Sequence, residues 1–387
     1  MPAQVTSGSW PYVTGRAAYD QGVSITTEQP RHASLPLLVL GQGRDLATER
    51  GVECPGELPA PSDPGLVKRA RDAKAALGDK VFVLGHHYQR DEVIEFADVM
   101  GDSFKLAKEA AARPEAAYIV FCGVHFMAEA ADILTADHQQ VVLPDLAAGC
   151  SMADMAAISQ VEDAWDDLAE MGVADHVIPV TYMNSSAAIK AFTGRHGGTI
   201  CTSSNAKTAL AWAFEQRGGL DGPGKVLFLP DQHLGRNTAV RELGLSLQDC
   251  VVFDPHKPAG SLTREQVQAA RVILWRGHCS VHGRFSLEAV NAARATIPGV
   301  RVIVHPECQY EVVDAADAVG STERIISTIA AAPDGSSWAV GTELNLVRSL
   351  AAMFPKQNIA FLEKNVCYCS TMNRIDLPHL VWALESL

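Results

Sequence analysis

The stretch VFVLGHHYQ at residues 81–89 joins a short apolar run to a polar cluster, and this combination recurs along the chain. Val81 to Leu84 are apolar without alternation, which is typical of a strand buried on both faces of a parallel sheet. Ala-rich stretches of helical length separate such runs, for example residues 104–112 and 287–295. This alternation predicts an α/β fold with parallel sheets. The other apolar runs are 117–121, 141–143, 177–180, 226–229, 251–253, 272–275, 300–304, 338–340 and 359–362.

Polar side chains follow almost every predicted strand. His86 and Tyr88 follow the first run, Tyr182 and Asn184 a later one, and further His and Cys residues follow others. In open parallel sheets, ligands bind beyond the carboxyl ends of the strands. The pattern therefore predicts a functional site assembled from several strand ends.

Ser, Thr and Asn also gather where predicted helices begin, at 101–103, 184–186, 202–205 and 320–322. Such residues cap helices by accepting hydrogen bonds from free backbone N–H groups. Hydroxyl groups beside helix N-termini also bind carboxylates and phosphates. Both interpretations remain open at this point, and the second favours a small substrate with two or three negative charges.

Length and charge limit the class of protein. The 387 residues predict two or three domains, and 47% hydrophobic with 20% charged residues is typical of a soluble globular chain. The net charge of −13 argues against nucleic-acid binding and against a basic membrane-surface protein. The chain has no apolar run of the ~18–20 residues that span a bilayer, and no signal peptide is recognisable, so we expect a cytoplasmic location with reduced thiols.

Three cysteine positions have matching contexts. Cys150, Cys279 and the pair Cys367 and Cys369 each follow a predicted strand after a short loop, and they are spaced 129 and then 88–90 residues apart, about one α/β unit each. Burial in the core is the default for such cysteines, and zinc sites usually take a closer pair. Three thiolates with one open position would suit a [4Fe–4S] cluster that acts as a Lewis acid.

At this point the motifs together resemble those of one family, the quinolinate synthases, which are iron–sulfur enzymes of de novo NAD biosynthesis. The resemblance extends over residues 66–380 in sequence order. It rests on HHYQ (86–89), GDS (101–103), FCGVHFMAE (121–129), LPDLAAGCSMAD (143–154), YMNSS (182–186), CTSSNA (201–206), LPDQHLGRNTA (229–239), RGHCSVHGRF (276–285), VHPEC (304–308), GSTERI (320–325), GTELNL (341–346) and CSTMNRI (369–375).

The resemblance implies three similar αβα domains in a pseudo-three-fold arrangement, with a [4Fe–4S] cluster where they meet. We expect an irregular extension at 1–65, a first domain at 66–150 completed by 368–387, a second at 151–279 and a third at 280–367. The reaction implied is the condensation of iminoaspartate with dihydroxyacetone phosphate to quinolinate. By the same resemblance the cluster ligands would be Cys150, Cys279 and Cys369, since the family's third ligand precedes a Met by three residues.

The resemblance also implies roles around the cavity. Glu307 and His305 would transfer protons, and Tyr182 and Tyr88 would act as further catalytic groups. The residues expected to line the cavity and bind substrate are His86, Tyr88, Ser103, Tyr182, Asn184, Ser203, His282, His305, Glu307, Ser321 and Thr322.

An aspartate-oxidising enzyme is the natural source of iminoaspartate, and a homodimer is compatible with the resemblance. Two alternatives stay open from the residues alone. One is an iron–sulfur sensor without catalysis, and the other is a zinc- or iron-dependent hydrolase.

Overall fold

The computed structural model describes residues 36–40, 50–53, 57–363 and 368–387, all within one compact unit, residues 34–387. Their strands form three sheets of six, five and four strands. The strands expected from apolar runs are all present, and the α/β fold class with three sheets is confirmed.

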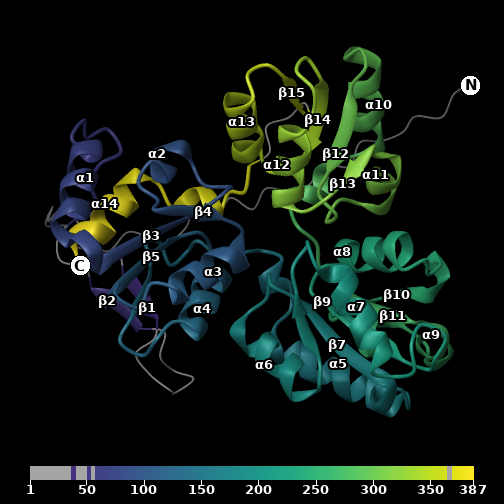
Figure 1. Ribbon diagram of the computed structural model, residues 1–387. Coiled ribbons are helices and arrows are strands. Elements are labelled where there is room, and N and C mark those ends of the chain that lie inside the picture. Colours follow the sequence, from purple (N-terminus) through teal and green to yellow (C-terminus); the bar gives the residue numbers. More distant parts are fainter. Residues whose placement is uncertain (1–35, 41–49, 54–56, 364–367) are drawn as a thin grey trace, which may run out of the picture. The chain divides into compact units, whose positions relative to one another are not determined.

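The first sheet has the order β2-β1-β6-β5-β3-β4, and four neighbouring strands in it run parallel. The C-terminal helix α14 (Leu377–Glu385) packs beside α1 (Leu66–Leu77), as Figure 1 shows in yellow and purple. The C-terminal end of the chain therefore belongs structurally with its first sheet. The parallel strands are β3 (Val81–His86), β4 (Val99–Gly101), β5 (Tyr118–Cys122) and β6 (Gln140–Leu143), and the other helices are α2 (Asp91–Ile94), α3 (Ser103–Ala111) and α4 (His125–Leu134).

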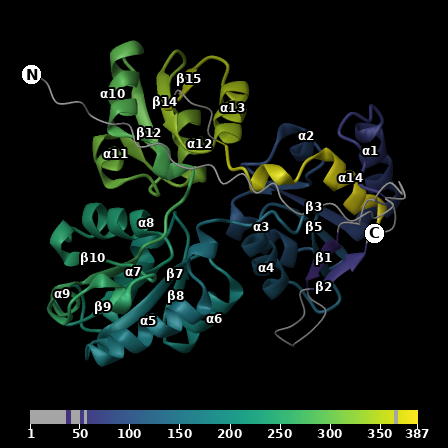
Figure 2. The same cartoon turned by 180° about the vertical axis from the view of Figure 1, so that it is seen from behind.

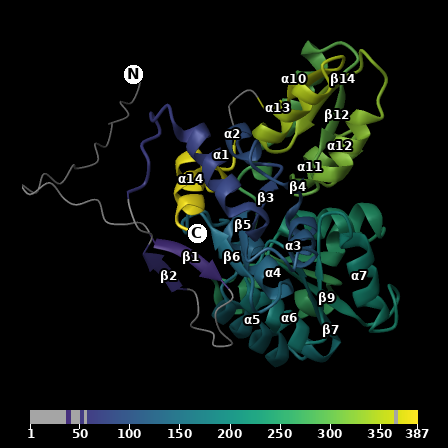
Figure 3. The same ribbon diagram turned by 60° about the vertical axis from the view of Figure 1, so that its left-hand side comes forward.

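Part of the expected irregular extension is regular. Residues Pro36–Leu40 form β1, which pairs antiparallel with β6, and Arg50–Glu53 form β2, which pairs antiparallel with β1 (Figure 3). The open edge of β6 provides the unpaired backbone groups that β1 uses. The expectation of an irregular chain was wrong at these two segments, because surrounding Pro and Gly residues obscured two short strands. Residues 57–65 of the expected extension contain turns but no helix or strand, and residues 1–35, 41–49 and 54–56 lie outside the described residues.

The second sheet is parallel throughout, with the order β10-β11-β9-β7-β8. Alternate residues of its strands enter different cores: Phe228 packs in one hydrophobic cluster, and Leu227 and Leu229 pack in another. Burial on both faces explains why these strands are apolar without alternation. The strands are β7 (Val177–Tyr182), β8 (Thr199–Cys201), β9 (Lys225–Leu229), β10 (Cys250–Phe253) and β11 (Val272–Trp275), and the helices are α5 (Ile158–Glu170), α6 (Ala187–Arg195), α7 (Ala206–Glu215), α8 (Gln232–Asn237) and α9 (Arg264–Ala269).

The third sheet repeats this arrangement with the order β13-β12-β14-β15. Val302 and Val304 pack against α10 and α11, whereas Ile303 packs with α12 and α13 on the other face (Figure 2). The strands are β12 (Arg301–Val304), β13 (Ala318–Val319), β14 (Ser337–Gly341) and β15 (Asn358–Phe361), and the helices are α10 (Leu287–Thr296), α11 (Tyr310–Ala315), α12 (Thr322–Ala330) and α13 (Leu344–Met353).

Each sheet has a very short strand at one edge, namely β4, β8 or β13, which leads to the start of a helix. The GDS, TSSN and GST motifs lie at these three junctions. Asp102 and Ser321 accept hydrogen bonds from backbone N–H groups of the helices that follow them. The capping interpretation therefore holds for these two residues. The domain boundaries stated above stay a prediction.

Within the described part of the chain, the longest apolar helices are too short to cross a bilayer.

Candidate active site

A cavity of about 90 Å³ gathers residues that follow strands of all three sheets. Most of the residues expected at the site line it. These are His86, Tyr88, Ser103, Cys150, Tyr182, Asn184, Ser203, Cys279, His282, His305, Glu307, Thr322 and Cys369.

Ser321 is placed differently from the rest. Its hydroxyl group caps α12, accepting from the backbone N–H of Arg324 at 3.4 Å, and its side chain lines a neighbouring groove. Ser203 lines both the groove and the cavity. The hydroxyl group of Thr322, one residue further on, reaches the cavity in its place.

His86 and His305 are held in the same way, each just after or at the end of a strand. Nδ1 of His86 accepts the backbone N–H of Tyr88 at 3.1 Å, and Nδ1 of His305 accepts that of Glu307 at 3.4 Å. Burial lowers the pKa of each imidazole to about 3, so both are neutral at pH 7. With Nδ1 accepting, the proton of each neutral ring is on Nε2. Both rings can therefore donate a hydrogen bond to a substrate oxygen.

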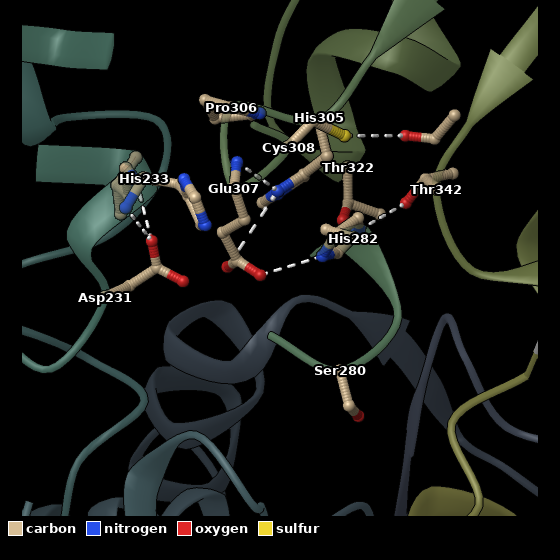
Figure 4. A network of polar contacts seen from close by, with 12 residues as sticks. Asp231, His233, Ser280, His282, His305, Pro306, Glu307, Cys308, Thr322 and Thr342 are labelled. Carbon is tan, nitrogen blue, oxygen red and sulfur yellow. Dashed lines mark hydrogen bonds and ion pairs between the residues drawn. The ribbon is translucent and has the colours of Figure 1, made fainter. Parts of the chain in front are cut away.

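Glu307 is the buried carboxylate at the centre of the polar network in Figure 4. Its Oε2 accepts from Nδ1 of His282 at 2.8 Å, and its Oε1 lies 3.8 Å from Nδ1 of His305. Burial opposes ionisation of Glu307, but the hydrogen bonds from His282 and Tyr182 favour the carboxylate and hold its pKa below the usual range. The rings of His282 and His305 stack at 4.4 Å, which fixes both around the carboxylate.

Two tyrosines complete the polar cluster. Burial and the nearby Glu307 carboxylate raise the pKa of Tyr182 well above its usual value. Burial also raises the pKa of Tyr88, whose hydroxyl group lies 3.1 Å from Oγ1 of Thr322 and 3.0 Å from Oγ1 of Thr342. Both phenols are protonated at pH 7, so Tyr182 is a possible proton donor beside an ionised carboxylate.

The three predicted cysteine ligands converge on the cavity from different sheets. Cys150 follows β6, Cys279 follows β11 and Cys369 follows β15. Burial raises the pKa of each of the three thiols. For Cys150 the pKa reaches about 12, because the neighbouring Cys369 adds to the effect of burial. Three buried thiolates need positive charge nearby, which a bound metal centre supplies. The donor set therefore fits such a centre. Cys367, the alternative third ligand, lies outside the described residues.

Sulfur, imidazole and carboxylate also come together at one point. One ligand atom each of Cys279, His282 and Glu307 lies within 4.8 Å of the other two, a spacing that could hold a metal ion. The seven cysteines in the described ranges are all free of disulfides. They are therefore available as thiols.

Glu343 supports the third cysteine, although it was not among the residues expected at the site. Its Oε1 accepts the backbone N–H of Cys369 at 3.2 Å, and its Oε2 accepts those of Asn345 and Leu346 at the start of α13. The side chain of Asn345 donates to the backbone oxygen of Tyr88 at 3.0 Å. The buried Glu343 and the half-buried Asn345 thus tie the Cys369 loop and Tyr88 to the start of α13.

Asp231 is a second buried acid that the sequence analysis did not place at the site. Its Oδ1 accepts the backbone N–H groups of His233 and Leu234 at 2.7 Å each, at the start of α8. Burial, and then the charge of Glu307, raise its pKa well above the usual range. Asp231 lies on the side of Glu307 away from His282 (Figure 4). Two buried carboxyl groups, one with a raised and one with a lowered pKa, thus lie next to each other.

Other residues also line the cavity, but no motif in the sequence indicated a role for them there. They are Asp102, Val124, Phe126, Met127, Gly149, Met152, Thr202, Val281 and Met372. Most are apolar, and their signal in the sequence is only their position beside the polar strand ends.

Together the fold and the cavity define a class: an α/β enzyme of three sheets, parallel except for β1 and β2, that combines three thiols with an acid–base cluster. The sequence pattern of the family described as Quinolinate synthetase A protein matches residues 68–387. The chain belongs to this quinolinate synthase family.

Individual relatives agree with this assignment. The chain is 74% identical over 355 residues to a quinolinate synthase of Nocardioides sp., covering 92% of this chain and 90% of that protein. It is 71% identical to one of Streptomyces coelicolor, covering 91% and 89% of the two chains. A third, from Corynebacterium glutamicum, is 56% identical, covering 86% and 83%. These matches do not favour the sensor or the hydrolase.

Proposed function

We propose that the protein condenses iminoaspartate with dihydroxyacetone phosphate to give quinolinate, inorganic phosphate and two water molecules, in cytoplasmic NAD biosynthesis. Carbon, nitrogen and phosphorus balance in this reaction without an oxidant or reductant. Family membership supports the reaction class. The observation that carries the proposal is that three thiols, one following a strand of each sheet, meet the Glu307 cluster in one cavity.

The ligands of the metal centre would be Cys150, Cys279 and Cys369, which together would hold a [4Fe–4S] cluster. With three protein ligands, one iron stays open, and the bound cluster supplies a Lewis acid that polarises a substrate oxygen. The convergence of the three thiols supports this assignment.

The chain's own residues provide for two anionic substrates. The Nε2–H groups of His86 and His305 are oriented as donors, because Nδ1 of each ring accepts a backbone N–H. Hydroxyl groups of Ser103, Ser203 and Thr322 line the same cavity. We assign these groups to substrate carboxylates and phosphate, together with the amide of Asn184.

Proton transfer is assigned to the central cluster. Glu307 is ionised and held by His282, so it can accept a proton from a carbon or nitrogen of the substrate. Tyr182 keeps its proton and lies beside that carboxylate, so it can return a proton to a leaving hydroxyl group. His305 orients the substrate next to Glu307, and Tyr88 orients it from the first sheet.

The unstable iminoaspartate would come from an aspartate-oxidising enzyme, either through solution or in a transient encounter. A homodimer is part of the proposal, and light scattering of the purified chain tests it.

The test is an anaerobic assay of the purified, iron- and sulfide-reconstituted chain. Iminoaspartate is generated in the reaction mixture, dihydroxyacetone phosphate is added, and quinolinate and phosphate are both quantified. Equal amounts of the two products are expected. Phosphate release without quinolinate would favour a hydrolytic reaction instead.

A further inference from the structure

Thr342 lies at the end of a strand of the third sheet, beside residues of the site. It follows Gly341, the last residue of β14, and Gly341 pairs with Val304 at the end of β12. A Cβ atom on Gly341 would lie 2.8 Å from the Val304 side chain, so this close approach requires glycine. The backbone N–H of His305 donates to the Gly341 oxygen at 3.0 Å. His305 and Thr342 therefore emerge side by side from adjacent strands.

The hydroxyl group of Thr342 is fully buried and touches two polar groups from other sheets. Its Oγ1 lies 3.0 Å from the hydroxyl oxygen of Tyr88, which follows β3, and 3.2 Å from Nε2 of His282, which follows β11. The rings of Tyr88 and His282 are 6.4 Å apart at their centroids. The threonine hydroxyl group thus bridges two side chains that come from different sheets.

The contacts continue at both ends of this bridge. Nδ1 of His282 is 2.8 Å from Oε2 of Glu307, and the Tyr88 hydroxyl oxygen is 3.1 Å from Oγ1 of Thr322. Thr322, Tyr88, Thr342, His282 and Glu307 therefore form one continuous hydrogen-bonded chain, part of which Figure 4 shows.

The chemistry of the carboxylate fixes the direction of the hydrogen bond at the Glu307 end of the chain. An ionised carboxylate only accepts, so Nδ1 of His282 carries a proton and donates to Glu307. Nε2 of the same ring is then left for the hydroxyl group of Thr342, which can donate or accept. The hydroxyl groups of Thr342, Tyr88 and Thr322 share the remaining two hydrogen bonds.

We propose that Thr342 is a positioning residue that sets the orientation of both Tyr88 and His282 through its single hydroxyl group. This inference rests on the proposed function, because Tyr88, His282 and Glu307 are the groups assigned to the substrate. Loss of the hydroxyl group leaves Nε2 of His282, in a side chain only 3% exposed, without its partner. The His282 ring then keeps its hydrogen bond to Glu307 and its stacking on His305, and the Tyr88 hydroxyl group keeps only Thr322, so both side chains are held less tightly.

Two variants separate the hydroxyl group from the volume of the side chain. T342V keeps the size and branching of threonine and removes the hydroxyl group, whereas T342S keeps the hydroxyl group and removes a methyl group. T193V is the matched control, because Thr193 is also fully buried, and its hydroxyl group donates to the Ile189 backbone oxygen within α6. All three are compared with the unaltered chain for kcat, KM and iron content.

We expect T342V to lower kcat by ~10²-fold with little change in KM or iron content, since loss of orientation at a reacting centre has effects of this size. T342S should restore most of the rate, and T193V should behave as the unaltered chain. Unchanged kcat in T342V, or equal damage in T342S and T342V, would overturn the proposal. If the unaltered chain makes no quinolinate, the proposed function fails instead, and the second measurement below still tests Thr342.

The second measurement requires neither turnover nor a folded variant. Histidine ¹⁵N spectra of the unaltered chain should show His282 protonated at Nδ1. A ring protonated at Nε2 alone would contradict the deduced direction and overturn the proposal. Where T342V is folded, its Nε2 resonance should shift, while that of T342S should not.

Discussion

Glu307 accepts a 2.8 Å hydrogen bond from Nδ1 of His282, and the two side chains are each only 3% exposed. A carboxylate so deeply buried would ordinarily take up a proton, because burial disfavours the charged form. The hydrogen bonds from His282 and Tyr182 reverse this tendency and hold the pKa of Glu307 below its usual range. The site therefore holds a desolvated, ionised base beside the protonated hydroxyl group of Tyr182.

The substitution Glu307→Gln tests this base. The amide keeps the shape of the side chain and can still accept from His282, but it cannot take up a proton. We expect the rate of quinolinate formation to fall ~10²–10⁴-fold, the usual contribution of a general base, with iron and sulfide content unchanged. Glu288→Gln, at an exposed position in the first turn of α10, serves as the control. Near-normal turnover of Glu307→Gln would remove this residue from the chemistry.

The choice of the third thiol is tested by a pair of cysteine variants. Cys369→Ala should abolish the iron–sulfur absorption after anaerobic reconstitution, because Cys369 lines the cavity with Cys150 and Cys279. Cys367→Ala should retain it. The opposite pattern of absorption, measured on matched protein concentrations, would transfer the assignment to Cys367.

Glu343 should stabilise the loop that carries Cys369. In Glu343→Gln an N–H₂ group must face one of the backbone N–H donors that the two carboxylate oxygens now satisfy. We expect a loss of about 1–3 kcal/mol in the free energy of unfolding, the cost of an unsatisfied buried donor, and faster loss of iron to a chelator.

Asp249→Asn is the control for Glu343, since Asp249 accepts the Ser246 backbone N–H away from the cysteine loop. Chelation kinetics that match between Glu343→Gln and the control would show that Glu343 does not hold the loop.

In the chain that lacks the cluster, low pH should reduce the free energy of unfolding, because the buried His86 resists protonation in the folded state. Burial, and then the neighbouring His87, lower the pKa of His86 to about 3 from 6.5, so between these values the unfolded state binds more protons than the folded state. The free energy of unfolding therefore falls as the pH is lowered from 7, and the His86 contribution lost by pH 5 is about 2 kcal/mol.

Urea unfolding at pH 7 and pH 5 measures this contribution. His86→Asn, which keeps an acceptor but no titratable ring, should lose less stability over the same interval than the unaltered chain. If the two proteins had the same pH dependence, His86 would not be buried in its neutral form in the folded state.

Much of the fold could be predicted because both faces of its strands are buried. Runs such as Val226 to Leu229 are apolar at every position, and this signal is strong in the sequence. The edge strands β4, β8 and β13 have two or three residues and exposed or half-buried positions, so they leave almost no hydrophobic pattern. Strands β1 and β2 were missed because each is short and stands in Pro- and Gly-rich surroundings.

The site divides along similar lines. Residues such as His305 and Glu307 could be named because unusual polar types stand at strand ends and match a family motif. Thr342 could not, since a threonine after a strand is ordinary, and its bridge between Tyr88 and His282 depends on how three sheets pack. Ser321 is the opposite case. Its motif correctly indicated the start of a helix, but its hydroxyl group caps that helix and was expected to bind substrate.

A titration of cluster content against activity tests directly whether three thiols hold a [4Fe–4S] cluster that the reaction needs. The anaerobic chain is reconstituted to graded extents, and iron, acid-labile sulfide and quinolinate formation are determined on each sample. We expect activity to rise in proportion to the cluster and to reach its maximum at about four irons and four sulfides per chain. Full activity with about one metal ion and no sulfide would contradict the three-thiol cluster and point to a mononuclear centre.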